Sequence, residues 1–242
     1  MGRVKTVIEA FVTNLGKYVE GELCGEYLKF PATKKDVQDL FSRIGIDGVL
    51  YEEYFITDYE SGIKGLRQVL GEYESIDELN YLAALIKDLD EYELEKFTAA
   101  VEYGEDISDI ADLINLTQNL ENYIIYPEVA DEEDLGHFFI EELSALEIPE
   151  HLEKYFDYGA YGRDISFNSN GIFSETCGGY LEQLSGEFTE HYKSRDDLPD
   201  EYKIFAYPDT EKMSIKDRLS MYKQMISPDA DIDKPYLVRD EI

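Results

Sequence analysis

Acidic residues dominate the middle of this 242-residue sequence. Residues 76–147 contain 21 Asp and Glu residues but only two bases, Lys87 and Lys96. This stretch alone carries −19 of the chain's formal net charge of −32. Like charges on a helix repel each other unless a base lies three or four residues away. Any fold of this stretch must therefore place its acids outward and leave most of their repulsion without a local counter-charge.

The apolar content is nevertheless sufficient for folded cores. Hydrophobic residues make up 43% of the chain, which includes 20 Tyr and 12 Phe. Intrinsic disorder requires low hydrophobicity together with high charge, and only the charge is present. No apolar run approaches the roughly 18–20 residues that span a bilayer, and the amino-terminal residues lack the pattern of a signal peptide. Cys24 and Cys177 are far apart and form no disulfide framework. We therefore expect a cytoplasmic protein without a membrane partner.

The first 74 residues predict a small α+β unit. Residues 4–13, 23–30 and 51–57 are rich in β-branched and aromatic residues and read as strands. Between the second and third, Thr33 and Asp36 form an N-cap pattern that predicts a short helix ending near Ile44.

Residues 75–121 change to a helical period and predict a compact acidic helical domain. Ser75 with Glu78 has the spacing of a capping box, and so does Asp90 with Glu93. Apolar residues recur at helical spacing after each, and a third apolar stripe runs over 107–114.

Residues 122–176 predict a second α+β domain, and residues 177–242 a C-terminal extension of unknown role. A strand over 122–129 precedes a helix capped by Asp131, whose apolar side is expected to run from Leu135 to Leu146. In the extension, residues 201–208 resemble a strand, Ser214 caps a helix, and the tail is irregular. The fold class is thus α+β in several domains.

Four adjacent acids open the helix at Asp131, and Glu141 and Glu142 follow two turns later. Acids in the first turn interact favourably with the helix dipole, by about 0.3–1 kcal/mol each. That accounts for one or two of them, but not for a run without any counter-base. A purely structural role stays open as an alternative. A halophile-like surface is another, although the 15 acids and nine bases of residues 177–242 do not fit a uniformly acidic surface.

Catalysis finds no support in the sequence. With 54 acids, a pair of carboxylates at catalytic spacing is expected by chance. Glu133, His137 and Glu141 share one helix face and are a weak metal-site candidate. Residues 229–240 imitate a calcium loop, but Lys234 stands where the sharp turn requires Gly. Phosphate loops and nucleophile signatures are absent. We predict a protein that is not an enzyme and has no cofactor or metal.

The spacing of the acids points to a partner instead. A charge of −32 repels nucleic acid and attracts proteins with basic grooves. Acids every three or four residues rise about 4.5–6 Å along a helix, on the scale of the ~3.4 Å between phosphates along one DNA strand. We predict a phosphate-like surface made of Asp88, Glu91, Glu95, Glu102, Glu105, Asp106, Asp109, Asp112, Asp131, Glu132, Glu133, Asp134, Glu141 and Glu142.

Five blocks of the sequence resemble, in order, the ArdA antirestriction protein family. They are VTNLGKYVEGELCGEYLKFP (12–31), YEEYFITDYE (51–60), SIDELNYLAALI (75–86), IPEHLEKYFDYGAYGRDI (148–165) and NGIFSE (170–175). The first and fourth are the longest and most specific. The resemblance covers residues 7–176, and the segment from Cys177 onward lies beyond the usual end of the family.

This resemblance implies an elongated, multi-domain DNA mimic that is not an enzyme and dimerises through its third domain. It implies that the partner is a type I restriction–modification enzyme, whose DNA-binding specificity and methyltransferase subunits form the groove that the mimic occupies. The family's acids form a distributed surface, so no single residue is expected to be catalytic. An acidic chaperone or scaffold for basic DNA-binding proteins is the alternative function.

Overall fold

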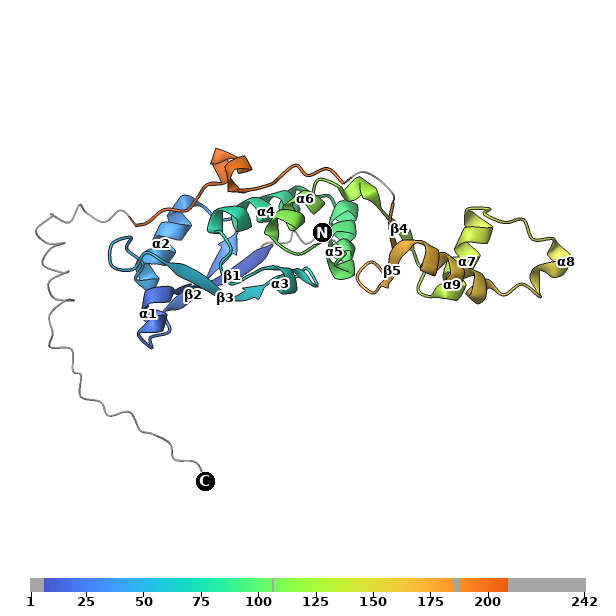
Figure 1. The fold of residues 1–242 in the computed structure, drawn as a ribbon, viewed down its shortest axis with the longest axis horizontal. Helices are drawn as coiled ribbons and strands as arrows, with labels where there is room; N and C mark the ends of the chain where they lie inside the picture. The colour runs from blue at the N-terminus through green and yellow to red at the C-terminus, as the bar shows by residue number, and fades with distance from the viewer. Residues whose placement is uncertain (1–6, 106, 185–187, 209–242) are drawn as a thin grey trace, which may run out of the picture. The chain divides into compact units, whose positions relative to one another are not determined.

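A computed structural model describes residues 7–105, 107–184 and 188–208 (Figure 1). Within these ranges the chain is a mixture of α-helices and two small antiparallel sheets, which confirms the predicted α+β class. No helix in these ranges combines the length and the apolar character needed to cross a bilayer.

The first sheet has the strand order β2-β1-β3. Its strands are β1 (Ile8–Asn14), β2 (Gly25–Phe30) and β3 (Tyr54–Glu60), and both pairings are antiparallel. The three predicted strands are thus confirmed, with bounds shifted by a few residues. A short helix, α1 (Leu15–Val19), follows β1, and Asn14 caps it by accepting a hydrogen bond from the Lys17 backbone.

Helix α2 (Lys34–Ile44) begins and ends as its sequence predicts. The Thr33 hydroxyl accepts a hydrogen bond from the Asp36 backbone, and the Asp36 carboxylate accepts one from the Thr33 backbone. Gly45 ends the helix with φ 78°, a conformation that costs glycine little. The buried side of α2 presents Val37, Leu40, Phe41 and Ile44. A single-turn helix, α3 (Leu66–Val69), follows β3.

The predicted helical stretch forms three helices, α4 (Ile76–Asp88), α5 (Glu91–Tyr103) and α6 (Ile110–Leu116). The Asp90–Glu93 capping box of α5 is confirmed. The predicted capping box of α4 is wrong, because the Ser75 side chain makes no cap hydrogen bond. Its expected partner Glu78 is buried and accepts hydrogen bonds from Tyr192 and Arg195 instead.

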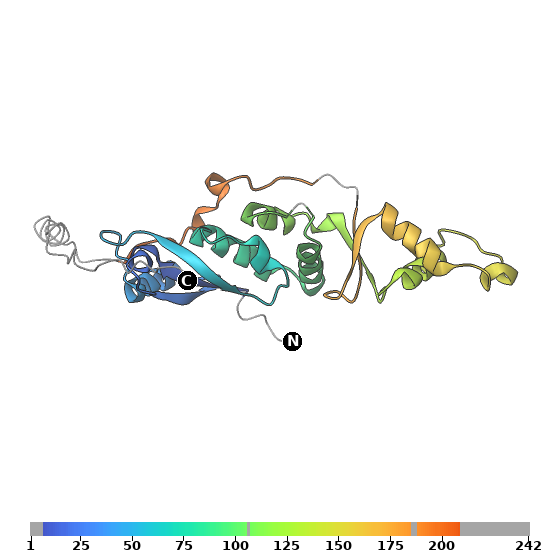
Figure 2. The same cartoon turned by 60° about the horizontal axis from the view of Figure 1, so that its bottom comes forward.

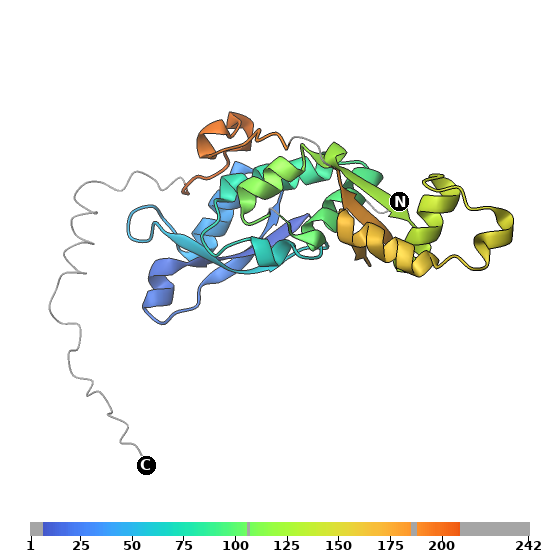
Figure 3. The same ribbon diagram turned by 45° about the vertical axis from the view of Figure 1, so that its right-hand side comes forward.

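The first sheet and the three helices share one hydrophobic core. Ile8 and Phe41 from the sheet region belong to the same buried cluster as Leu79, Phe97 and Leu113 from the helices. The first sheet and α4–α6 lie side by side in the views of Figures 1 and 3. A domain boundary after residue 74 therefore stays a prediction, and any such boundary would cross a continuous core.

A second antiparallel sheet has the order β4-β6-β5. β4 (Tyr123–Pro127) follows a 3₁₀ turn at Leu120–Asn122, and β5 (Asn170–Ser174) pairs with β6 (Gly179–Gln183). The central strand β6 lies in the stretch that the sequence assigned to the C-terminal extension. Its Tyr180 and Leu181 are buried, so this part of the extension completes the sheet.

Beyond β4 the chain forms α7 (Glu132–His137), a π-helical turn (Phe138–Glu142), α8 (Glu150–Glu153) and α9 (Tyr158–Asn168). Helices α7 and α9 cross at Gly136 and Gly162, where a Cβ on Gly162 would lie 1.7 Å from the Glu132 carbonyl oxygen. The predicted apolar face of this helix is wrong beyond Glu142: the helical turns end there, and Leu143 and Leu146 are exposed.

Residues 188–208, here called the strap, run along α6 and α4 toward α2 (Figure 2). The predicted strand at 201–208 is wrong. The strap contains 3₁₀ turns at Arg195–Asp197 and Asp200–Tyr202, and its remaining described residues are irregular. They pair with side chains of the helices rather than with a strand edge, as described below. The predicted Ser214-capped helix and the irregular tail lie outside the described residues.

Candidate functional site

The first group of predicted acids lies at the end of α4 and along α5. Asp88 and Glu91 are exposed, and Glu95 is half-exposed. None of their carboxylates has a hydrogen-bond or ion-pair partner in the part of the chain that the structure describes. The capping box of α5 uses the neighbouring Asp90 and Glu93. These three carboxylates are therefore available to a partner.

Glu102, near the end of α5, is not free. Its carboxylate forms an ion pair with Lys64 and accepts hydrogen bonds from the hydroxyls of Ser174, at 2.8 Å, and Thr176, at 2.5 Å. Burial raises the pKa of this carboxyl, but the bonds from Lys64, Thr176 and Ser174 outweigh burial and lower the pKa to about 2. Glu102 joins α5 to the turn between β5 and β6, which is a structural role.

The acids after Glu102 do not continue a helical row. Helix α5 ends at Tyr103, and Gly104 turns the chain with φ 71°. Glu105 accepts a hydrogen bond from the Tyr103 hydroxyl. Asp109 caps α6 by accepting from the backbones of Ala111 and Asp112. The expected spacing along one helix is therefore wrong for this group. Asp106 lies outside the described residues.

Asp112 has a local partner as well. Its carboxylate accepts hydrogen bonds from the backbone and the hydroxyl of Ser108, at 2.8 and 2.7 Å. Asp112 and Asp109 thus stabilise the start of α6 from both sides, and their donors are backbone amides and a hydroxyl rather than bases. An acid can both cap a helix and present charge to a partner.

The run Asp131–Asp134 divides into two structural and two free acids. Asp131 is the N-cap of α7, as predicted, and accepts from the backbones of Glu133 and Asp134. Asp134 accepts a hydrogen bond from the Ala130 backbone at 3.1 Å. The carboxylates of Glu132 and Glu133 have no partner among the described residues. Capping therefore explains half of this run and leaves the other half without a structural role.

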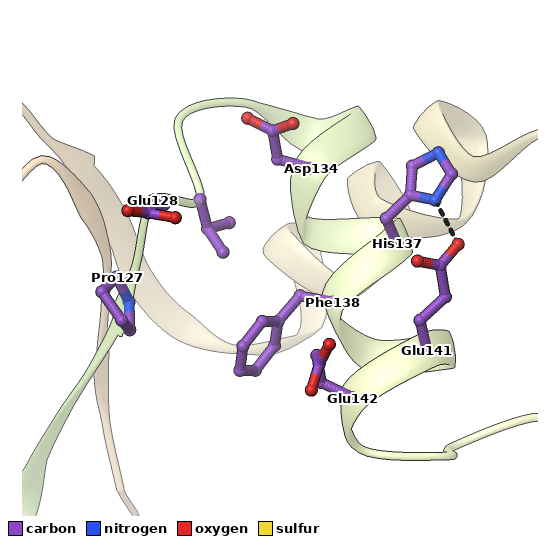
Figure 4. Close-up of a pocket in the computed structure, with 8 residues that line it drawn as sticks. Pro127, Glu128, Asp134, His137, Phe138, Glu141 and Glu142 are labelled. Carbon is purple, nitrogen blue, oxygen red and sulfur yellow. Dashed lines mark hydrogen bonds and ion pairs between the residues drawn. The ribbon is translucent and has the colours of Figure 1, made fainter.

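A shallow hollow of about 350 Å³ lies beside α7 (Figure 4). Four carboxylates line it, those of Glu128, Asp134, Glu141 and Glu142, together with His137. His137 Nδ1 lies 2.7 Å from the Glu141 carboxylate, and the Tyr158 ring stacks on the imidazole at 3.8 Å. The hollow is open and strongly acidic, which suits contact with a cation of a partner better than enclosure of a small molecule.

The metal-site alternative finds no geometric support in the described ranges. No group of three or more His, Cys, Asp or Glu side chains there is arranged to hold an ion. Among the described residues, Glu133 forms no hydrogen bond or ion pair with His137 or Glu141. The calcium-like residues 229–240 lie outside these ranges.

Sequence reasoning missed two kinds of residue. Glu128 was not singled out, yet it lies in the acidic hollow with φ 62°. The buried Asn115 and Asn119 of the α6 segment were also missed; both bind the backbone of the strap. Their only sequence signal is an amide at an apolar position of a helical pattern.

The sequence model of the antirestriction protein (ArdA) family matches residues 10–182. No curated protein matches the chain significantly. The matched region contains all of the predicted acidic residues and, apart from the first two residues of β1 and the last residue of β6, both sheets, and it excludes the strap. ArdA proteins are inhibitors rather than enzymes, and their name assigns them an antirestriction function. The chain belongs to the ArdA antirestriction protein family.

Proposed function

We propose that this protein inhibits type I restriction–modification enzymes by mimicking DNA. Its target is the DNA groove formed by the specificity and methyltransferase subunits, and its acids take the place of phosphates there. The observation that carries the proposal is the set of exposed carboxylates between Asp88 and Glu142 that form no ion pair with any base in the described ranges.

The charge distribution supports this mechanism. Of the two bases in residues 76–147, Lys96 donates to the Leu120 carbonyl and lies over the Tyr92 ring, and Lys87 pairs with no acid in the described ranges. A basic groove would therefore meet a surface whose charges are not already neutralised. Such a surface steers a basic partner and releases counterions from it on binding, as DNA does.

We further propose that the protein is a homodimer joined through the region of α8 and α9. Large apolar side chains are exposed there, among them Tyr155 at 75% and Phe167 at 80%. Leu143, Leu146 and Leu152 are exposed nearby in the sequence. A second copy of the chain would bury these side chains. The protein is proposed to act in the cytoplasm, where restriction enzymes meet incoming DNA.

A competition assay tests the proposed function. Labelled duplex DNA is bound to the specificity–methyltransferase complex, and the protein is titrated in at several salt concentrations. A DNA mimic displaces the duplex, and its affinity falls by orders of magnitude between roughly 50 and 200 mM salt. A generic basic protein such as a histone serves as the control. Equal binding to the histone would favour the chaperone or scaffold alternative, and an affinity that is flat with salt would contradict mimicry.

A further inference from the structure

The strap lies outside the region that matches the family, yet it is bound closely to that region. Tyr192, Leu198 and Ile204 of the strap are buried, at 2%, 4% and 6% exposure. They belong to the same hydrophobic cluster as the first sheet and the helices. The strap is thus an integral layer of the fold, and its contacts show which elements it holds.

Two buried amides, Asn115 in α6 and Asn119 three residues beyond its end, bind the strap backbone. Asn115 Oδ1 accepts hydrogen bonds from the backbones of His191 and Tyr192, at 2.9 and 2.8 Å, and its Nδ2 donates to the Tyr192 carbonyl at 2.7 Å. Asn119 accepts from the Thr189 backbone and donates to the Thr189 carbonyl. Leaving a buried amide without a hydrogen-bond partner costs free energy. The side chains of Asn115 and Asn119 therefore stabilise α6 in the position where the strap supplies their partners.

The middle of the strap is anchored on α4. The Tyr192 hydroxyl donates to one oxygen of Glu78 at 2.7 Å, and Arg195 Nε donates to the other at 2.8 Å. Asp77 accepts from the backbones of Ile204 and Phe205 at 2.7 and 2.6 Å. Two acids of α4 are therefore used by the strap and are not part of the free acidic surface.

The far end of the strap is anchored on the first sheet region. The Phe205 ring packs edge-on against Phe41 of α2, with 5.6 Å between the ring centroids. The Tyr207 hydroxyl donates to the Glu52 carbonyl at 3.0 Å, and its own carbonyl accepts from Gln38 at 2.9 Å. One continuous segment thus binds α6, α4 and α2 in turn.

Helix α6 depends most on this arrangement. It has only seven residues, and helices this short are not stable without tertiary contacts. Helix α4 packs against it on one side, and the strap binds Asn115 and Asn119 at its carboxyl end. At its amino end lie Asp109 and Asp112, two of the acids assigned to the partner-binding surface.

We propose that the strap is an intramolecular clasp that positions α6, and with it the acids of residues 109–112, before the target binds. This inference deepens the proposed function and, for its effect on binding, rests on it. A mimic whose charges already match the target groove loses less freedom on binding than one that must order them. If only a fraction of molecules has α6 in place, the apparent affinity falls by that fraction.

The test removes the amides of α6 and measures both order and binding in the full-length chain. The variant is Asn115→Ala with Asn119→Ala, which changes no charge. The matched control is Gln118→Ala, whose amide has no hydrogen bond to the described strap residues. Amide hydrogen exchange is followed over 107–119 and 189–205, with β3 as an internal reference. The clasp predicts exchange about tenfold faster in both segments of the double variant, and wild-type exchange in the control.

Competition with duplex DNA gives the second measurement. The double variant is expected to compete about fivefold more weakly than the wild type, and the control variant as well as the wild type. Should the double variant fail to fold, Asn119→Ala alone leaves the three Asn115 bonds in place and is measured in the same way, with a smaller expected effect in both assays.

The two measurements together show whether the strap holds α6 and whether this affects binding. Unchanged exchange in 107–119 would overturn the clasp, because the strap would then not hold α6. Faster exchange with unchanged competition would overturn its role in positioning the acids. If the wild type itself fails to displace DNA, the proposed function fails, while the exchange measurement still decides whether the strap orders α6.

Discussion

The amino-terminal region and the acidic middle of this chain differ in how their acids form ion pairs. Four acids of residues 7–75 form ion pairs with bases of the same region, such as Arg43 with Glu26 at 2.7 Å and Arg67 with Asp58 at 2.7 Å. In residues 76–147, three described acids form ion pairs. Two of their partners, Lys64 and Arg195, come from outside the region, and the third is His137.

This difference in ion pairing affects the electrostatic field of the two regions more than their stability. An exposed ion pair contributes only about 0–1 kcal/mol, so the pairs of the amino-terminal region add little to folding. What they change is the field, because a paired acid is largely neutralised at a distance. The middle region retains its negative electrostatic field, and its acids repel one another. We infer that the retained field is what the partner uses.

The largest effect is expected from neutralising several free acids of the middle together. Five carboxylates without a partner or cap role are changed to amides, which should weaken DNA competition more than tenfold because each removes one phosphate-like contact. The variant carries Asp88→Asn, Glu91→Gln, Glu95→Gln, Glu133→Gln and Glu142→Gln. Inhibition of restriction and circular dichroism measure binding and folding separately.

The matched control changes five exposed acids of the amino-terminal region. Glu22→Gln, Glu52→Gln, Glu53→Gln, Glu60→Gln and Glu72→Gln alter the net charge by the same amount. They should weaken competition much less. Equal losses in the two variants would break the comparison and show that the acids of both regions act as one surface.

Salt should move stability and affinity in opposite directions. Added salt screens the self-repulsion of the free protein, so its melting temperature should rise by several degrees between low salt and about 0.5 M. The same salt weakens binding to the target. Thermal melts and competition over one salt series test this. A melting temperature that falls or stays constant would mean that the repulsion in the middle region is already compensated.

Glu102 is the predicted surface acid that behaves like the paired acids of the amino-terminal region. Glu102→Gln should destabilise the fold by about 1 kcal/mol at neutral pH, a figure that allows for the exposure of Lys64. Because its folded pKa of about 2 lies below the ordinary value of 4.5, its stabilisation is present above pH 4.5 and is lost as pH falls toward 2. Wild type and variant should therefore converge in denaturation curves over that range, and an offset that persists below pH 2 would contradict the assignment.

The smallest effect is expected from Asp109 alone. Asp109→Asn keeps the cap of α6, because Asn is as good an N-cap as Asp, and removes one of many charges. Stability and inhibition should both stay close to wild type. Asp109→Ala should instead cost about 1 kcal/mol of stability. A large loss of inhibition in the Asn variant would reveal a discrete site in place of a distributed surface.

Local signals predicted most of the secondary structure. The capping boxes at Thr33 and Asp90 are formed, and Asp131 caps its helix, because each needs only residues within one turn. The Ser75 box has the same signal and fails, because Tyr192 and Arg195 take Glu78 from more than 100 positions away. No pattern within one helix can show a partner at that separation.

The sequence alone determined the composition-driven features of this protein: its acidic middle, the helix starts at Thr33, Asp90 and Asp131, the strands β1 to β4 and its resemblance to a family. These depend on residue type and short spacing. The tertiary structure decided which acids are free. It assigned Glu102 to a network with Lys64 and Ser174 and placed residues 188–208 over α6 and α4. Whether a carboxylate is free depends on the hydrogen-bond donors that folding brings to it. The positions of these donors follow from the packing of the whole chain rather than from residues nearby in the sequence.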